Sequence, residues 1–465
     1  MQPLVVLDVV GLTSRQLGER TPNLLALAQR GAHAPMSTIL PAVTCSAQAT
    51  MLTGALPSDH GAVGNGWMEP ATREVALWRQ PNGLVAGEKL YEVARGRIPG
   101  FRCAKLFWWW NLGAAVDLSI TPRPFYPADG RKILAVYSDP PEFGEATERD
   151  LGPFPFFEFW GPRSGLGSSR WIARATLRTL SSERPHLTLA YLPHLDYDHQ
   201  RYGPDDPRSL EALSEIDRIV GEVAEGCERE GARLVVVSEY GISAVDRPIE
   251  VNRALRAAGL LAVRETPTGD VLDPFRSHAF ALADHQVAHV YARQPTDALL
   301  AREVLSELPG VALVLDRGAQ REYGIDHPRS GDFVLVAERG AWFTYPYWPE
   351  GGAEPDFART IDIHRKPGYD PCELFVDPAL RFPRLGVASF LLRKKLGLRA
   401  LLRVVPLDPT LVRGSHGRLP EDPLDGPVFL SSGPWSECGG EPANGVVTMT
   451  SVKSRLLELL RHANA

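Results

Sequence analysis

The chain has 465 residues, 44% of them hydrophobic, so it is long enough to bury a large core and to form two or three structural units. Its net charge is −6 with both signs interspersed, which argues against a surface for nucleic acid polymers. Five scattered cysteines lack the pairing of a disulfide framework, and no run of 18 apolar residues exists to span a membrane. A first strand starting at residue 3 leaves no room for a secretory leader, so we expect a cytoplasmic protein without a membrane span.

Asp8 ends the first predicted strand, an apolar run over residues 3–11. Ligands of parallel α/β sheets bind at the carboxyl ends of strands. A helix follows, with Thr21 as its N-cap and Pro22 at its first position. Thr44 comes next, directly before the helical run 47–53. A hydroxyl at a helix N-terminus is a cap in most proteins, but it also lies where a phosphate is favoured, which suits a nucleophile.

Polar and aromatic residues then follow at the next strand ends. Asn65, in the loop 60–65, is either an amide donor for the same pocket or a turn residue. Lys105 precedes the aromatic run 107–111 and is a candidate for binding substrate, with a surface lysine as the alternative. Trp108 and Trp110 are candidates for stacking on a substrate ring, with a place in the core as the alternative.

Three later segments add charged groups. The strand 186–192 runs into a loop that holds Asp196 and His199, and oxygen plus imidazole ligands suit zinc or manganese. An amphipathic helix over 207–230 leads to the strand 233–237, after which comes Glu239. His416 lies in a glycine-flanked turn at 413–417. Together these residues predict metal-assisted phosphoryl transfer.

The order of these residues resembles the alkaline phosphatase superfamily, in its nucleotide pyrophosphatase/phosphodiesterase branch and the related phosphonoacetate hydrolase. Asp8 and Thr44 stand 36 residues apart, and Thr44 and Asn65 stand 21 apart, as in that branch. The Thr-Pro-Asn-Leu helix start at 21–24 and the Gly-Ser-His-Gly turn at 414–417 also match. The resemblance is most specific over residues 1–68.

The resemblance implies an α/β fold with a mostly parallel sheet between helices and a small inserted α+β cap. It implies two divalent metals, zinc or alternatively manganese, about 4 Å apart. Asp8 and Thr44 would bind one metal, and Asp196 and His416 the other. Thr44 would form a phosphothreonine that water hydrolyses, while Asn65 would bind a phosphoryl oxygen. Lys105 is similar in position to a carboxylate-binding lysine of phosphonoacetate hydrolase.

Two departures from the family pattern concern the metals. The family motif Ser-Asp-His-Gly reads Ser-Glu-Tyr-Gly at 238–241, and a neutral phenol is a poor zinc ligand. The family histidine four residues after its aspartate is absent, since His199 follows Asp196 by three. His194, Asp198 or His199 is left to share that role. We expect His364, beside Arg365 and Lys366, to compensate for Tyr240.

We divide the chain into a first part of the catalytic core (1–262), an inserted cap (263–345) and a return to the core (346–465). We expect a metal-dependent hydrolase of phosphodiester, pyrophosphate or phosphomonoester bonds, acting on a small phosphate ester or nucleotide-like substrate. The alternatives are a phosphonate hydrolase and a non-catalytic member with a degenerate metal site. We interpret His285 and His289 as structural. The basic, apolar segment 391–399 is a packed helix with a solvated basic face, or else an amphipathic helix for a membrane surface or another subunit.

Overall fold

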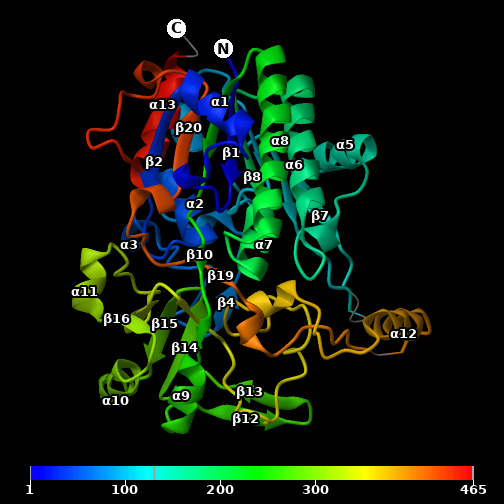
Figure 1. Ribbon diagram of the computed structural model, residues 1–465, viewed down its shortest axis with the longest axis vertical. Helices are drawn as coiled ribbons and strands as arrows, with labels where there is room; N and C mark the ends of the chain where they lie inside the picture. Colours follow the sequence, from blue (N-terminus) through cyan, green and yellow to red (C-terminus); the bar gives the residue numbers. More distant parts are fainter. Residues whose placement is uncertain (1, 129–131, 399, 463–465) are drawn as a thin grey trace.

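A nine-stranded sheet forms the centre of the computed structural model, which describes residues 2–128, 132–398 and 400–462 (Figure 1). The strand order is β21-β2-β20-β9-β1-β8-β5-β6-β7. Central β1 pairs in parallel with β8 and β9, and β5 pairs in parallel with β8 and β6. The expected α/β class with a mostly parallel sheet is confirmed. The strands are β1 (Leu4–Val9), β2 (Ala32–Ser37), β5 (Cys103–Leu106), β6 (Leu118–Pro122), β7 (Val136–Asp139), β8 (Leu187–Leu192), β9 (Arg233–Val237), β20 (Val428–Ser431) and β21 (Val447–Thr448).

Helices cover both faces of this sheet because its central strands are apolar on both sides. In β1, the side chains of Val5 and Leu7 join one core cluster, and those of Leu4 and Val6 join the other. The first cluster lies under α1 (Pro22–Arg30), α5 (Pro141–Leu151), α6 (Leu166–Ser182), α7 (His194–Tyr202) and α8 (Pro207–Arg229). The second lies under α2 (Thr44–Thr53), α4 (Leu90–Arg97) and α13 (Val452–His462), with the short α3 (Pro57–His60) after α2.

A second, antiparallel sheet lies within the segment expected to be the inserted cap. Its strand order is β14-β15-β17-β16. Helix α9 packs on β14, and the core cluster of this region includes Met68 and Leu77, so its packing extends beyond residues 263–345. The predicted domain limits stay a prediction. The elements are α9 (Val251–Ala257), β14 (Ala279–Asp284), β15 (Val287–Ala292), α10 (Pro295–Ser306), β16 (Val311–Leu315), α11 (Arg317–Glu322) and β17 (Phe333–Ala337).

Short strand pairs lie outside the two sheets. β19 (Gly414–Ser415) pairs with β10 (Ser243–Ala244), and this pairing brings His416 back beside the end of β9. The other pairs are β3 (Gly66–Met68) with β4 (Val75–Leu77), β11 (Arg247–Ile249) with β18 (Ala341–Phe343) and β12 (Val263–Thr266) with β13 (Gly269–Leu272). Helix α12 (Pro383–Lys395) projects from the side of the molecule (Figure 1). Within the described residues, every helix is too short or too polar to cross a membrane.

Candidate active site

The carboxyl ends of β1 and β9 bring two acidic side chains together. Asp8 pairs in register with Val237, and Glu239 follows two residues later; both carboxyls are fully buried. Gln48, from α2, bridges them: its Nε2 donates to Asp8 Oδ2 (3.1 Å) and to Glu239 Oε1 (2.6 Å). The Trp109 N–H holds Gln48 Oε1 at 2.5 Å, so the amide presents only its donor to the carboxyls.

The buried carboxyl pair has raised pKa values. Burial raises the pKa of Asp8, and the nearby negative charge of Glu239 raises it further. Burial also raises the pKa of Glu239. Two adjacent carboxylates cannot both ionise cheaply in an apolar interior. Within the described part of the chain, Asp8 Oδ1 and Glu239 Oε2 have no hydrogen-bond partner.

A chain of hydroxyl groups joins Thr44 to Asp196. Thr44, the first residue of α2, has its Oγ1 3.1 Å from Tyr240 Oη. Tyr240 Oη donates to Asp196 Oδ1 at 3.5 Å, while Gln200 Nε2 donates to Asp196 Oδ2 at 2.7 Å. Burial raises the pKa of Asp196 to about 7. Asp196 is therefore a carboxyl that can take up and release a proton near neutral pH.

Four rings from distant segments stack into an aromatic column: Tyr240, His416, His285 and Tyr369. Successive ring centroids lie 3.6, 3.8 and 3.7 Å apart. His416 Nδ1 donates to the Ala42 carbonyl (2.8 Å), and its Nε2 lies 3.7 Å from Asp196 Oδ1. Burial lowers the pKa of His416 and His285, so the column is neutral. The column fills the space beside Thr44 with the protein's own side chains.

Asn65 lies beside the helix of Thr44, as expected, but its groups already have protein partners. Its Oδ1 accepts from the Cys45 N–H (3.0 Å). Its backbone N and Nδ2 donate to the two oxygens of Asp284 (2.8 and 3.0 Å), at the end of β14. The β14–β15 hairpin therefore places a carboxyl where the resemblance predicts a phosphoryl oxygen.

The segment that contains Asp196 and His199 was expected to be a loop, but it forms the helix α7. The helix determines which of its residues face Thr44. Residues four apart share a helix face, so Asp196 and Gln200 lie together. His199 packs near Gly11, with its Nδ1 3.7 Å from the position that a Cβ on Gly11 would take, and neither ring nitrogen has a hydrogen-bond partner in the described structure. His194 points elsewhere, with its Nε2 3.3 Å from Glu215. The expectation that His199 binds a metal beside Asp196 stays a prediction.

His364 also lies away from the site. It is exposed and lines a separate cavity of about 410 Å³ with Arg73, Arg79 and Arg365. His364 therefore does not lie beside Tyr240, for which it was expected to compensate. The imidazole that packs against His416 is His285.

The three residues expected to contact substrate are buried in the core. Lys105 Nζ donates to the Trp110 carbonyl (2.7 Å), and burial lowers its pKa to about 7. The Trp110 indole donates to the Cys45 carbonyl (3.0 Å), and Trp108 packs in the core beneath α4 and α13. Residues 107–111 follow β5 as an irregular turn whose side chains are buried. Through the bond to Cys45, this turn holds the first residues of α2 in place.

Four residues of the site were missed from sequence: Gln48, Gln200, Asp284 and His285. The Asp-His pair at 284–285 was a visible signal, but the whole stretch to His289 was interpreted as structural. That interpretation holds for His289, whose ring bonds the Val63 carbonyl and the Gly331 N–H. For His285 it stays a prediction: the hairpin turn stacks that ring on His416, beside the site.

These residues do not fit the zinc pair that the resemblance implies. Tyr240 and Gln200 stand where two family imidazoles are expected, and phenol and carboxamide are poor zinc ligands. Gln48 directs N–H groups at the two carboxyls that would otherwise hold a cation. Over residues 2–128, 132–398 and 400–462, no group of three or more His, Cys, Asp or Glu side chains has the arrangement of a metal site.

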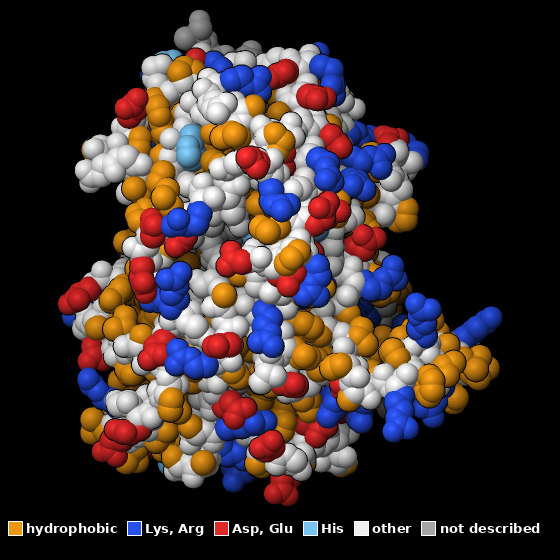
Figure 2. Space-filling view, in the orientation of Figure 1, with side chains coloured by type: hydrophobic (Ala, Val, Ile, Leu, Met, Phe, Trp, Pro, Cys, Tyr) orange, Lys and Arg blue, Asp and Glu red, His pale blue; other side chains and the backbone are white. Residues whose placement is uncertain are grey.

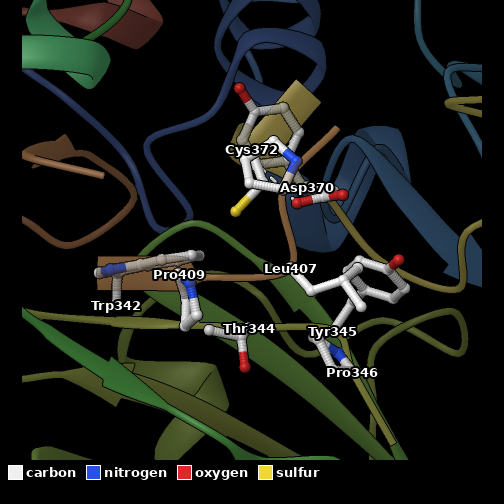
Figure 3. Close-up of a pocket in the computed structure, with 10 residues that line it drawn as sticks. Trp342, Thr344, Tyr345, Pro346, Asp370, Cys372, Leu407 and Pro409 are labelled. Carbon is white, nitrogen blue, oxygen red and sulfur yellow. Dashed lines mark hydrogen bonds between the residues drawn. The ribbon is translucent and has the colours of Figure 1, made fainter. Parts of the chain in front are cut away.

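A small cavity adjoins the aromatic column at Tyr369. Its volume is about 20 Å³, and Figure 3 shows Trp342, Tyr345, Leu407 and Pro409 around it. This volume suits one water molecule. The cavity is therefore a packing gap beside the site and not a place for substrate.

Comparison with known proteins identifies relatives. The family model for type I phosphodiesterase / nucleotide pyrophosphatase matches residues 4–370. An uncharacterized pyrophosphatase/phosphodiesterase of Schizosaccharomyces pombe is 25% identical over 229 residues, which are 48% of this chain and 41% of that protein. An ectonucleotide pyrophosphatase/phosphodiesterase 1 of Saccharomyces cerevisiae is 25% identical over 222 residues, 43% of this chain and 27% of that protein. The chain thus matches less than half the length of these two relatives.

Solved structures with the same fold cover nearly all of this chain. Phosphonoacetate hydrolase from Sinorhizobium meliloti, in complex with phosphonoformate, has a TM-score of 0.58 at 16% identity and covers 98% of this chain and 96% of its own. Murine ectonucleotide pyrophosphatase / phosphodiesterase 5, in complex with AMP, has a TM-score of 0.57 at 15% identity and covers 99% and 95%. At these identities the likeness establishes the fold.

Proposed function

Because the chain belongs to the type I phosphodiesterase / nucleotide pyrophosphatase family, we propose that it hydrolyses a phosphodiester or pyrophosphate bond with Thr44 Oγ1 as nucleophile. The observation that carries the proposal is the hydrogen-bonded chain from Thr44 through Tyr240 to Asp196. This chain gives the threonine proton a route to a carboxyl whose pKa lies near neutrality.

In the first step, Thr44 Oγ1 attacks phosphorus and the leaving oxygen departs with the electrons of the broken P–O bond. The Thr44 proton passes to Tyr240 Oη, and the phenol proton passes to the Asp196 carboxylate. Water then attacks the phosphothreonine and the P–Oγ1 bond breaks. The proton held by Asp196 returns through Tyr240 Oη to Thr44 Oγ1, which restores both groups. The protons of the attacking water stay with the released phosphate and solvent, and the leaving oxygen of the first step takes a proton from solvent. The N-terminus of α2 favours the negative charge that develops at phosphorus.

Metal dependence stays a prediction, and the donor set described above does not favour a zinc pair. In the family resemblance, a bound metal lowers the pKa of the attacking threonine. Here Tyr240 and Asp196 are placed to accept the same proton without it. Elemental analysis of the purified protein after dialysis against a chelator tests whether a metal or the Tyr240–Asp196 pair activates Thr44. Two equivalents of zinc would contradict activation by the pair alone.

The proposal is tested with three single variants and a nitrophenyl phosphodiester. Thr44→Ala should reduce turnover to background. Tyr240→Phe keeps the ring on His416 but removes the hydroxyl, so kcat should fall about 10²–10⁴-fold. Ser46→Ala is the matched control, since Ser46 is a buried hydroxyl of the same helix without a hydrogen-bond partner in the described structure. Full activity of Thr44→Ala, or equal losses in Ser46→Ala, would overturn the proposal.

A second candidate is a family member that binds without catalysis. Two observations favour it: Gln48 bridges the carboxyls, and Asp284 occupies the donors of Asn65. Wild-type protein that turns over no nitrophenyl diester or monoester, nucleotide sugar or phosphonoacetate would support this candidate. Lys105 was the one residue that favoured a phosphonate substrate, as a candidate to bind its carboxylate. Lys105 is fully buried in this structure, so it no longer supports that alternative.

A further inference from the structure

Helix α12 stands apart from the body of the molecule. It projects to one side in Figure 1, and none of its 13 residues, all of them described, is buried. Figure 2 shows hydrophobic side chains along this projection with Lys and Arg around them. A packed helix with only a basic face exposed, which we preferred from the sequence, is therefore not what the fold contains.

The helix has two apolar faces with different surroundings. Val387 points inward and packs against the cluster that contains Val404 and Val405, which holds the helix to the body. Leu385, Leu392 and Leu396 stand seven and four residues apart, so they share another face. They are 66%, 59% and 66% exposed. The outer apolar face thus has no partner within the described structure.

Charge around this face has a single sign. Residues 378–407 contain seven Lys and Arg and no Asp or Glu, in a chain whose net charge is −6. Arg393, Lys394 and Lys395 form the last turn of α12 and are exposed. Leucines flanked by an unbroken set of cations are complementary to a surface that is apolar beneath a layer of anions.

We propose that α12 binds an anionic lipid membrane, lying in its plane with Leu385, Leu392 and Leu396 at the boundary between headgroups and acyl chains. The cations at the end of the helix contact the lipid phosphates, and the exposed leucines contact the acyl chains. The helix has 13 residues, too few to span a bilayer, so the attachment is peripheral.

A second copy of the chain fits this surface less well. Two copies joined through their α12 leucines would bring like charges together, since each copy carries only cations there. An anionic bilayer instead neutralises those charges and covers the whole leucine face. The proposal is independent of whether Thr44 is catalytic.

Co-sedimentation of the full-length protein with vesicles tests the proposal. Binding to vesicles of phosphatidylcholine with 30% phosphatidylglycerol should exceed binding to phosphatidylcholine alone by at least about tenfold, and 0.5 M salt should remove most of this difference. The double variant Leu392→Glu, Leu396→Glu and the double variant Lys394→Glu, Lys395→Glu should each lose at least about tenfold in binding.

The matched control is Leu299→Glu with Leu300→Glu, two leucines of α10 that are 67% and 51% exposed. This variant should bind as the wild type does. Equal binding to neutral and anionic vesicles would overturn the proposal, as would an equal loss in the α10 control. A dimer in light scattering that disappears in the Leu392, Leu396 variant, without vesicle binding by the wild type, would assign the face to a second copy instead.

Discussion

At the scale of single residues, Gln48 decides the character of the site. A carboxamide at this position holds Asp8 and Glu239 together with its two N–H groups, and its own oxygen is fixed by the backbone of Trp109. Buried carboxyls are costly unless they are hydrogen-bonded or share a proton. Gln48 supplies this stabilisation from within the chain, in a place where relatives are expected to use a cation.

Lys105 is the residue whose burial has the clearest effect on stability. Its pKa falls from 10.5 to about 7 on burial. Between these values the unfolded chain binds one more proton than the native chain at this residue, so the free energy of unfolding rises with pH. Below pH 7 both states are protonated and the full cost of burying the charge remains.

We therefore predict a pH-dependent difference between the wild type and Lys105→Met. The wild type should gain up to about 1.4 kcal/mol of stability per pH unit relative to the variant, from pH 7 upward. Urea unfolding of both proteins at pH 6, 7, 8 and 9 measures the difference. Curves that stay parallel across this range would show that Lys105 is solvated and remains a candidate for substrate binding.

At the scale of elements, the spacing along α7 sets which ligands face Thr44. An α-helix repeats every 3.6 residues, so the side chains three and four positions after Asp196 lie on opposite sides of it and point about 100° apart. This sequence has histidine at the first position and glutamine at the second. A one-residue difference in spacing therefore separates an imidazole from the site.

This geometry predicts that two substitutions create zinc affinity. The double variant Gln200→His with Tyr240→His places imidazoles beside Asp196 and Glu239, and it should bind zinc at least about tenfold more tightly than the wild type. Competition with a chromogenic chelator measures the affinity. His199→Ala is the control and should leave zinc binding unchanged in either background. Equal zinc affinity in the wild type and the double variant would contradict this arrangement of the site.

At the scale of the whole molecule, Asp284 links the second sheet to the loop that holds Asn65. It lies at the end of β14 in the second sheet and accepts two hydrogen bonds from Asn65. His285 follows it and packs between His416 and Tyr369. One hairpin turn thus contacts both the helix of Thr44 and the late segments of the chain.

We predict that Asp284→Ala weakens this junction. Removing the acceptor leaves the buried donors of Asn65 unpaired, which should cost about 2–4 kcal/mol of unfolding free energy and increase hydrogen exchange over residues 62–68. Asp332→Ala is the control: Asp332 accepts from the Ala292 N–H, a bond within the second sheet. It should destabilise that sheet without increasing exchange at 62–68. Unchanged exchange there in Asp284→Ala would mean that the loop of Asn65 is held by other contacts.

The same scales separate what could be predicted from the sequence and what could not. Apolar runs, proline helix starts and strand-end acids are local patterns, and they correctly predicted the α/β class with a mostly parallel sheet and a helix at residues 47–53, which the structure extends back to Thr44. Asp8, Thr44, Glu239, Asp196 and His416 do converge, because parallel strands end at one edge of a sheet. The predicted ligand roles of these residues, the cytoplasmic location and the metals stay predictions.

Tertiary packing alone decided which atoms meet at that edge. The column of Tyr240, His416, His285 and Tyr369 draws on four segments, and no local pattern encodes their stacking. Gln48 and Gln200 face the site because of their positions on their helices. Lys105, at the end of β5, and Trp108 and Trp110, in the turn after it, have side chains buried in the core and do not line the site. The sequence determined where polar groups end each strand; the packing of distant segments determined whether those groups face a substrate, a cation or one another, because only packing sets their final distances.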